Sequence, residues 1–211
     1  MHLLIIGASR GVGRKCVDEA LARGHTVRAF SRSASDIPIT DPEFEPYPGD
    51  ATSPPDLTKA ARGVDAVLLT LGIKESVSMI WKEVHLFSDA TKALIPAMYA
   101  AGVTRLICLT GLGAGDSRTV YSKPERLGFN AILGKAYDDK SRQEALITAS
   151  NLDYTLVRPT ILTHNAKGPY KVLTDPNTWR NGVISRASVA DFMVGAAEDG
   201  SYSRQAVVIT R

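Results

Sequence analysis

Three glycines near the start of the chain have a spacing that is typical of a phosphate-binding turn. Gly7, Gly11 and Gly13 stand between an apolar run at residues 2–6 and an amphipathic stretch at about 11–23. In such a turn the first glycine allows a tight reversal, the second lets backbone N–H groups approach a diphosphate, and the third lets helix and strand pack closely. We therefore expect this loop to bind a dinucleotide, with a plain turn as the alternative. Its residues are Gly7, Ala8, Ser9, Arg10, Gly11, Val12 and Gly13.

The residues after the second apolar run indicate which dinucleotide is bound. A site for NAD usually has Asp or Glu there, because a carboxylate accepts a hydrogen bond from the ribose 2′-hydroxyl. This chain has Ser31, Arg32 and Ser33 instead. Arg32, together with Arg10 of the glycine loop, suits a 2′-phosphate, since guanidinium groups pair with phosphate in a bidentate way. The sequence thus predicts NADP(H) rather than NAD(H), unless both arginines are ordinary surface residues.

Apolar runs alternate with helical patterns along the chain. The runs occupy residues 2–6, 26–30, 44–48, 66–71, 105–110, 154–158 and 206–210, and the helical patterns about 11–23, 54–62, 82–101, 136–150 and 188–199. Several runs are apolar at consecutive positions, as expected of parallel strands that helices cover on both faces. We therefore predict an α/β fold of the Rossmann type. One domain, residues 1–211, would hold a doubly wound parallel sheet of about seven strands with helices on both faces.

Two long stretches, at about 111–134 and 159–187, show no regular pattern. Such stretches usually carry function in a compact domain, so we expect them to line the substrate side. An anionic substrate would be attracted by their basic residues, and a planar one would stack on aromatic residues, although solvated charges and ordinary packing explain both sets. The basic residues are Lys123, Arg126, Lys135, Lys167 and Lys171, and the aromatic ones are Trp81, Phe129, Tyr170 and Trp179.

Composition and charge exclude several classes of protein. The formal net charge of +3 comes from 25 basic and 22 acidic residues that are scattered along the chain, so neither a nucleic acid nor a membrane surface is expected as a partner. Cys16 and Cys108 lie in apolar segments and no ligand spacing accompanies them, which predicts buried free thiols and no metal. The first apolar run is too short for a signal peptide or an anchor, and we expect a cytoplasmic protein.

With these elements in order, the chain resembles the atypical branch of the short-chain dehydrogenase/reductase superfamily. This NAD(P)H-binding group includes NADPH-dependent flavin or biliverdin reductases and NmrA-like proteins. The segments GASRGVG, SRS, LLTLG, LTGLGAGD and SNLDYTLVRPTILT follow one another as the family's motifs do. The resemblance implies that residues after the third, fourth and sixth runs border the cofactor, namely Asp50, Ala51, Leu71, Gly72 and Pro159.

Family enzymes that move a proton with the hydride use a Tyr-x-x-x-Lys pair and a serine after the fifth strand, because a nearby ammonium lowers the pKa of the phenol. Lys140 stands where the lysine is expected, yet the tyrosine position is Ala136 and the serine position holds Thr110. Tyr137 precedes Lys140 by three residues, so it shares a helix face with Lys140 but points roughly a hundred degrees away from the family's direction. The resemblance implies Tyr137, Lys140 and Thr110 as catalytic candidates, with Lys140 and Thr110 also touching the cofactor.

His164 and Tyr121 are further candidates for proton transfer. His164 begins the substrate-side stretch, where an imidazole is able to donate to a carbonyl, and Tyr121 lies in the other irregular stretch. Hydride transfer to a conjugated acceptor needs mainly that donor and acceptor be held face to face. We therefore expect an NADPH-dependent oxidoreductase, monomeric or homodimeric, that reduces a small planar or anionic molecule such as a flavin or quinone. A non-catalytic NADP(H)-binding redox sensor and an NADP-retaining epimerase or isomerase are the alternatives.

Overall fold

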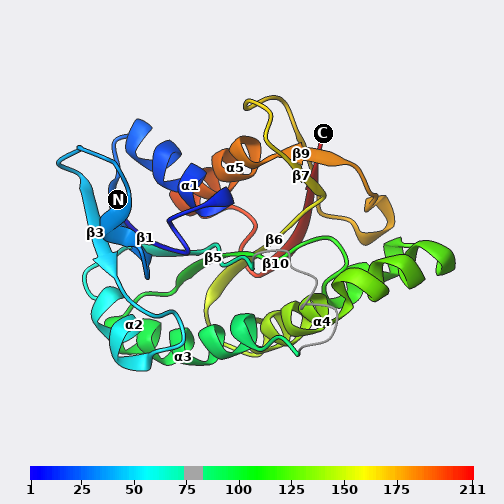
Figure 1. The fold of residues 1–211 in the computed structure, drawn as a ribbon, viewed down its shortest axis with the longest axis horizontal. Helices are drawn as coiled ribbons and strands as arrows, with labels where there is room; N and C mark the ends of the chain where they lie inside the picture. Colours follow the sequence, from blue (N-terminus) through cyan, green and yellow to red (C-terminus); the bar gives the residue numbers. More distant parts are fainter. Residues whose placement is uncertain (74–82) are drawn as a thin grey trace.

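One mixed sheet organises the molecule. The computed structural model describes residues 1–73 and 83–211. Its eight-stranded sheet has the order β3-β2-β1-β4-β5-β6-β10-β8, and all neighbours are parallel except β8, which runs antiparallel to β10 (Figure 1). The strands are β1 (His2–Ile6), β2 (Thr26–Ser31), β3 (Phe44–Pro48), β4 (Ala66–Leu69), β5 (Arg105–Leu109), β6 (Asp153–Pro159), β8 (Lys171–Leu173) and β10 (Gln205–Thr210). The strand order reverses between β1 and β4, and ligands of open α/β sheets bind at such a reversal.

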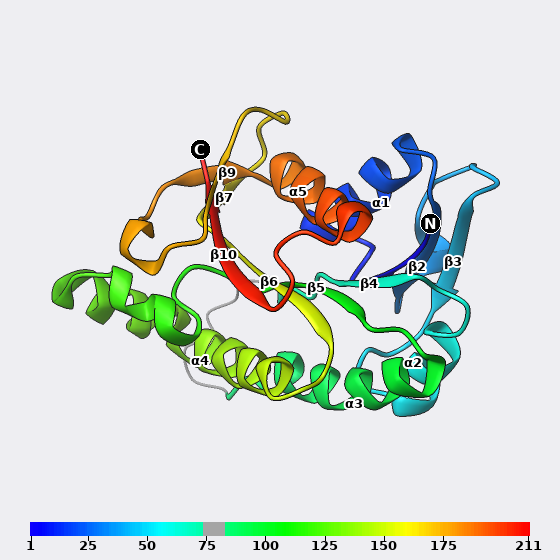
Figure 2. The same ribbon diagram turned by 180° about the vertical axis from the view of Figure 1, so that it is seen from behind.

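Helices cover both faces of the sheet. Helices α1 (Gly11–Ala22) and α5 (Arg186–Asp199) lie on one face, and α2 (Pro54–Ala60), α3 (Leu86–Ala101) and α4 (Lys123–Thr148) lie on the other (Figures 1 and 2). Successive side chains of a strand point to opposite faces, so consecutive apolar residues supply two cores. In β1, Leu3 and Ile5 join the core under α1 and α5, whereas Leu4 and Ile6 join the core under α2 and α3. The predicted fold class is therefore confirmed.

Both cysteines are buried free thiols, as predicted, and they lie in different cores. Cys16 of α1 packs on one face of the sheet and Cys108 of β5 on the other. Burial in apolar surroundings raises the pKa of both thiols, so neither is activated as a nucleophile. None of the helices within the described residues has the length and apolar character needed to cross a bilayer.

The sheet is larger than the sequence predicted. All seven predicted strands are present, and β8 adds an eighth at the edge. A separate two-stranded sheet pairs β7 (Ile161–Thr163) with β9 (Val183–Ser185), so the stretch 159–187 is less irregular than expected. Strands of three residues are too short to show a period, which is why the sequence did not reveal them.

The prediction that residues 111–134 are irregular is wrong in its second half. Helix α4 begins at Lys123 rather than near position 136. Its start is a capping box, in which the backbone N–H of Ser122 donates to the Glu125 carboxylate at 2.9 Å, with proline in the first turn. Glycines in this stretch weaken the helical pattern, and they concealed a start that the capping signal marks.

Candidate functional site

The loop between β1 and α1 has contacts that only glycine allows. Gly7 has a φ of +90°, and its N–H donates to the carbonyl oxygen of Phe30 at the end of β2 at 2.9 Å. A Cβ on Gly13 would overlap the carbonyl oxygen of Gly7, so α1 begins directly against the loop. No side chain caps the first turn of α1, and that turn contains no acidic residue. Its N–H groups therefore suit an anion such as a diphosphate.

The remaining loop residues divide by exposure. Ala8 and Val12 are buried and fix the loop on the sheet, Ser9 is partly exposed, and Arg10 and Gly11 are exposed. Gly11 has a φ of +59°, and a Cβ there would meet no atom within 4 Å. The exposed side of the loop is thus its backbone together with the Arg10 side chain.

The end of β2 has the groups expected for a 2′-phosphate. The hydroxyl of Ser31 is buried and has no hydrogen-bond partner within the described part of the chain. Arg32 is exposed. The pKa of the Asp50 carboxyl is lowered mainly by the two hydrogen bonds that Thr52 donates to it, and the nearby charge of Arg32 lowers it further. A buried hydroxyl that lacks a partner costs free energy unless a ligand satisfies it. Ser31 and Arg32 therefore offer a hydroxyl group and a cation to a ligand at the end of β2.

The ends of β4, β5 and β6 form the other half of the site. Leu71 is partly buried after β4, and Gly72 is exposed, with no atom near the position of a Cβ. Pro159 ends β6, and its carbonyl oxygen accepts the N–H of Leu112 at 3.1 Å. Thr110 follows β5 and is buried. These residues line the carboxyl edge on the β4 side of the strand reversal, and Asp50 with the partly exposed Ala51 lies on the β3 side.

The three catalytic candidates converge at the end of β5. Lys140 donates from Nζ to the carbonyl oxygen of Thr110 and lies 4.7 Å from the ring centroid of Phe87 and 5.8 Å from that of Tyr137. The phenol of Tyr137 covers Gly111, because a Cβ on that glycine would lie 2.6 Å from the hydroxyl. Spacing of three residues therefore still brings the tyrosine and the lysine to one place.

Burial changes the acid–base character of this lysine. It lowers the pKa of Lys140 to about 8, while the neighbouring thiol of Cys108 and the carboxyls of Glu144 and Asp139 act in the opposite direction. A lysine with this pKa is able to exchange a proton near neutral pH as well as donate hydrogen bonds. Asp139 also has a structural part, because its buried carboxylate accepts the N–H groups of Phe87 and Ser88 at the start of α3.

A buried ion cluster beside these residues was not foreseen from the sequence. Arg158 of β6 is 3% exposed and binds the carboxylate of Glu144 through Nε at 3.0 Å and Nη2 at 2.7 Å. That carboxylate also accepts the Thr110 hydroxyl at 2.7 Å, and Nη2 of Arg158 lies 2.7 Å from Asp116. The guanidinium stacks on the ring of Trp179 at 4.9 Å. The cluster thus ties the end of β5 to α4, β6 and the segment after β5.

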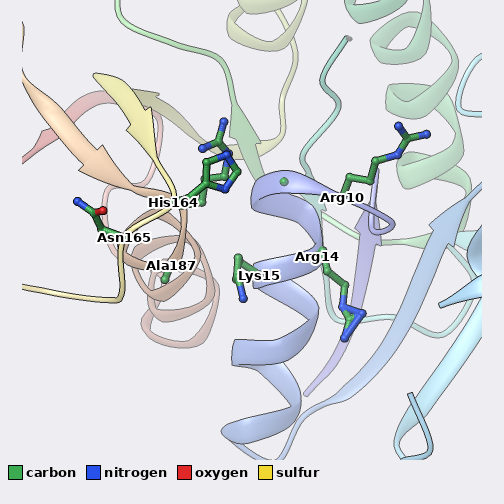
Figure 3. Close-up of a pocket in the computed structure, with 8 residues that line it drawn as sticks. Arg10, Arg14, Lys15, His164, Asn165 and Ala187 are labelled. Carbon is green, nitrogen blue, oxygen red and sulfur yellow. The ribbon is translucent and has the colours of Figure 1, made fainter. Parts of the chain in front are cut away.

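Tyr121 and His164 have surroundings of their own. Tyr121 donates from its hydroxyl to the carbonyl oxygen of Leu112 at 3.2 Å, and burial together with the charge of Glu125 raises the pKa of its phenol. His164 lines a cavity on the far side of the α1 N-terminus from the end of β2 (Figure 3). A role of His164 in proton transfer stays a prediction.

The basic and aromatic residues of the two long stretches have varied positions. Lys167 binds Glu19 and Asp191, both at 3.1 Å, so its charge is already balanced. Tyr170 donates to Asp191 at 2.9 Å and packs on a core aromatic ring, and Trp179 lies under the ion cluster. Trp81 and the side chains of Lys123, Arg126 and Phe129 lie outside the described part of the molecule.

No group of three or more His, Cys, Asp or Glu side chains that could hold a metal occurs within residues 1–73 and 83–211.

A comparison with protein-family models identifies the family of the chain. A family model described as NAD(P)H-binding matches residues 7–200. YhfK of Bacillus subtilis strain 168, described as an uncharacterized sugar epimerase, is 26% identical over 217 residues, which cover 100% of this chain and 94% of that protein.

Two solved structures have the same fold. ChuY of Escherichia coli O157:H7, described as an anaerobillin reductase, has a TM-score of 0.82 and 25% identity, covering 100% of this chain and 97% of that one. A short-chain dehydrogenase/reductase of Veillonella parvula DSM 2008, solved in complex with NADP, has a TM-score of 0.83 and 17% identity, covering 100% and 94%.

Proposed function

Since the chain belongs to the NAD(P)H-binding family, we propose that it is an NADPH-dependent reductase that transfers hydride to a small conjugated acceptor such as a flavin or quinone. The observation that supports the choice of NADPH most strongly is the buried hydroxyl of Ser31, which has no hydrogen-bond partner within residues 1–73 and 83–211, next to the exposed Arg32. Both groups suit a 2′-phosphate, and the glycine loop next to them suits a diphosphate.

The cofactor would lie along the carboxyl edge of the sheet. Its diphosphate would be held by N–H groups between Gly7 and Gly13, and its 2′-phosphate by Ser31, Arg32 and Arg10. Asp50 and Ala51 would border the adenine. Leu71, Gly72 and Pro159 would border the nicotinamide half, which places that half near Lys140.

At the nicotinamide end, the side chains would mainly bind and orient the cofactor and the acceptor. Bound NADPH would supply the hydride, which is chemistry of the cofactor itself. Lys140 would donate a hydrogen bond to the ribose while its contact with the Thr110 carbonyl fixes its direction. Tyr137 would stand over Gly111 beside the acceptor, where its phenol is able to donate a proton after the hydride has moved.

A similar protein and two positions of the sequence support the proposed acceptor. ChuY, with 25% identity over the whole chain, is a reductase, which supports reduction of a small organic molecule. The altered positions Ala136 and Thr110 support an acceptor that needs little proton transfer from the protein, since a conjugated ring system delocalises the charge that the hydride brings.

The choice of cofactor is tested by binding. In Arg32→Ala we expect the NADPH dissociation constant to rise roughly 10- to 100-fold, because a charge-assisted pair with phosphate is lost, while that for NADH changes less than about threefold. Arg62→Ala, which removes an exposed arginine that follows α2, serves as the control. Equal affinities of the wild type for the two cofactors would refute the preference.

Turnover is tested with a panel of acceptors. Loss of NADPH absorbance with flavins, quinones and carbonyl compounds would support the reductase, with the highest rate expected for a conjugated acceptor. Tight NADPH binding without consumption by any acceptor would favour a redox sensor, and interconversion of a sugar without net loss of NADPH would favour an epimerase, as the description of YhfK suggests for that relative.

A further inference from the structure

A cavity next to the glycine loop is lined by cationic residues. It has a volume of about 290 Å³ and lies between the first turns of α1 and the start of α5 (Figure 3). Four lining residues have a permanent positive charge, Arg10, Arg14, Lys15 and Arg186, and His164 is a fifth ionisable group. None of the lining residues is acidic.

The cations flank the N-terminus of α1 on two sides. Figure 3 shows the side chains of Arg10 and Arg14 extending away from His164, on the side of α1 that faces β2. Lys15 lies on the other side of the helix, between α1 and α5. Arg10 lines the cavity and is also proposed for the 2′-phosphate, whereas Lys15, His164 and Arg186 are basic groups of the cavity that the 2′-phosphate does not use.

The placement of these charges opposes the helix dipoles. The cavity meets two helix N-termini, since Gly11 begins α1 and Arg186 begins α5. Neither helix has an acidic residue in its first turn. A helix N-terminus has a partial positive charge, so cations near it are unfavourable unless an anion is present. Natural sequences retain such local conflicts mainly where function requires them.

Counter-charges within the described residues do not balance this cluster. Arg186 donates from Nη1 to the backbone oxygen of Leu162 at 3.3 Å, and among the ion pairs of the described residues none joins a carboxylate to Arg186 or to His164. Asp18 is the carboxylate nearest to Lys15, at 3.6 Å, and it binds Arg14 more closely, at 2.9 Å. An anion in the cavity would meet positive charge from both helices.

We infer that Lys15, His164 and Arg186 form a subsite for an anionic arm, a carboxylate or a phosphate, of the acceptor. The inference rests on the proposed function. One wall of the cavity belongs to the cofactor loop and the other to the segment after β7, which lies in the stretch that we expect to line the substrate side. An acceptor with such an arm would lie beside the diphosphate, with its conjugated ring toward the ends of β4 and β5.

FMN and riboflavin form a matched pair of probes, because they share one ring system and differ by a phosphate. We compare kcat/KM for both at saturating NADPH in the wild type and in Lys15→Gln/Arg186→Gln. The wild type should prefer FMN by roughly 10- to 100-fold at low salt, since two charge-assisted contacts hold its phosphate. In the variant the preference should fall below about threefold, with riboflavin kinetics and the NADPH dissociation constant unchanged.

Controls separate the possible failures. Lys59→Gln/Lys92→Gln removes two exposed charges on the other face of the sheet and should keep the FMN preference. A rise in the NADPH dissociation constant in Lys15→Gln/Arg186→Gln would assign the cavity to the cofactor and overturn the inference. If neither flavin is turned over, fluorescence titration of the NADP⁺-loaded protein decides, and equal or absent binding of the two flavins overturns the subsite. Failure to bind NADPH, in contrast, overturns the proposed function itself.

Discussion

Replacing Glu144 by leucine tests how the buried ion cluster supports the site. Glu144 is 4% exposed and binds Arg158 through two hydrogen bonds, of 3.0 and 2.7 Å. Glu144→Leu leaves the Arg158 guanidinium, which is 3% exposed, without its main counter-charge. It also removes the acceptor of the Thr110 hydroxyl. We therefore expect loss of stability together with misplacement of the end of β5.

The expected magnitude follows from the burial of both partners. Removing one member of a buried pair typically costs about 3–5 kcal/mol, because a charge remains buried without compensation. Asp116 still lies 2.7 Å from Nη2 of Arg158, so we expect the lower end, about 3 kcal/mol. For a chain of this size that corresponds to a fall in Tm of roughly 6–12 °C. The double variant Glu144→Leu/Arg158→Met should recover most of the loss, since it leaves no buried charge without a partner and the Asp116 carboxylate is exposed.

Urea unfolding followed by far-UV circular dichroism measures these differences. The control is Asp138→Asn, which breaks the more exposed pair between Arg118 and Asp138 and should cost less than about 1 kcal/mol. A loss below about 1 kcal/mol in Glu144→Leu, or a double variant less stable than the single one, would refute the reasoning that the pair is a coupled buried unit.

Three further predictions concern other parts of the site. The pKa of Lys140 is about 8 in the folded chain and 10.5 in the unfolded one, so between these pH values only the unfolded state keeps the proton. The wild type should therefore gain stability relative to Lys140→Met as pH rises from 8 to 10.5, and its kcat/KM should fall above pH 8. A difference in urea unfolding that does not change with pH would contradict this. Asp139→Ala should lower the free energy of unfolding by about 2–3 kcal/mol, because two N–H groups at the start of α3 lose their buried acceptor. An unchanged midpoint of urea unfolding would contradict this prediction. Gly13→Ala should lower the free energy of unfolding by about 2–3 kcal/mol and abolish NADPH binding, because the new Cβ overlaps backbone atoms. Gly11→Ala, which is strained only by a φ of +59°, should lower it by about 1–2 kcal/mol. Equal losses of stability in the two variants would be inconsistent with the geometry.

The elements with strong local signals were predictable from sequence. Consecutive apolar residues such as 3–6 of β1 identified a strand covered on both faces, and the glycines at 7, 11 and 13 located the strand–helix turn. Lys140 was singled out because its position follows a family motif, and its catalytic role stays a prediction. The direction of Tyr137 could not be predicted, since it depends on how α4 packs over Gly111.

Features that arise from tertiary contacts were not predictable to the same extent. Arg158 lies in the apolar run LVRP, and a cation there signals a buried partner, but the sequence does not say that the partner is Glu144, fourteen residues away on α4. The cationic cavity joins Lys15 with Arg186, which lie far apart in the chain and meet only because α1 and α5 pack side by side. Local patterns contain no information about such pairs until the topology is known.

Calorimetric titration of the purified wild-type protein with NADPH, and separately with NADH, tests the central claim most directly. We predict a measurable heat of association for NADPH with one site per chain, and binding of NADH at least roughly tenfold weaker, as expected when a phosphate contact is missing. Folded protein that gives no heat of association with either dinucleotide would contradict the account.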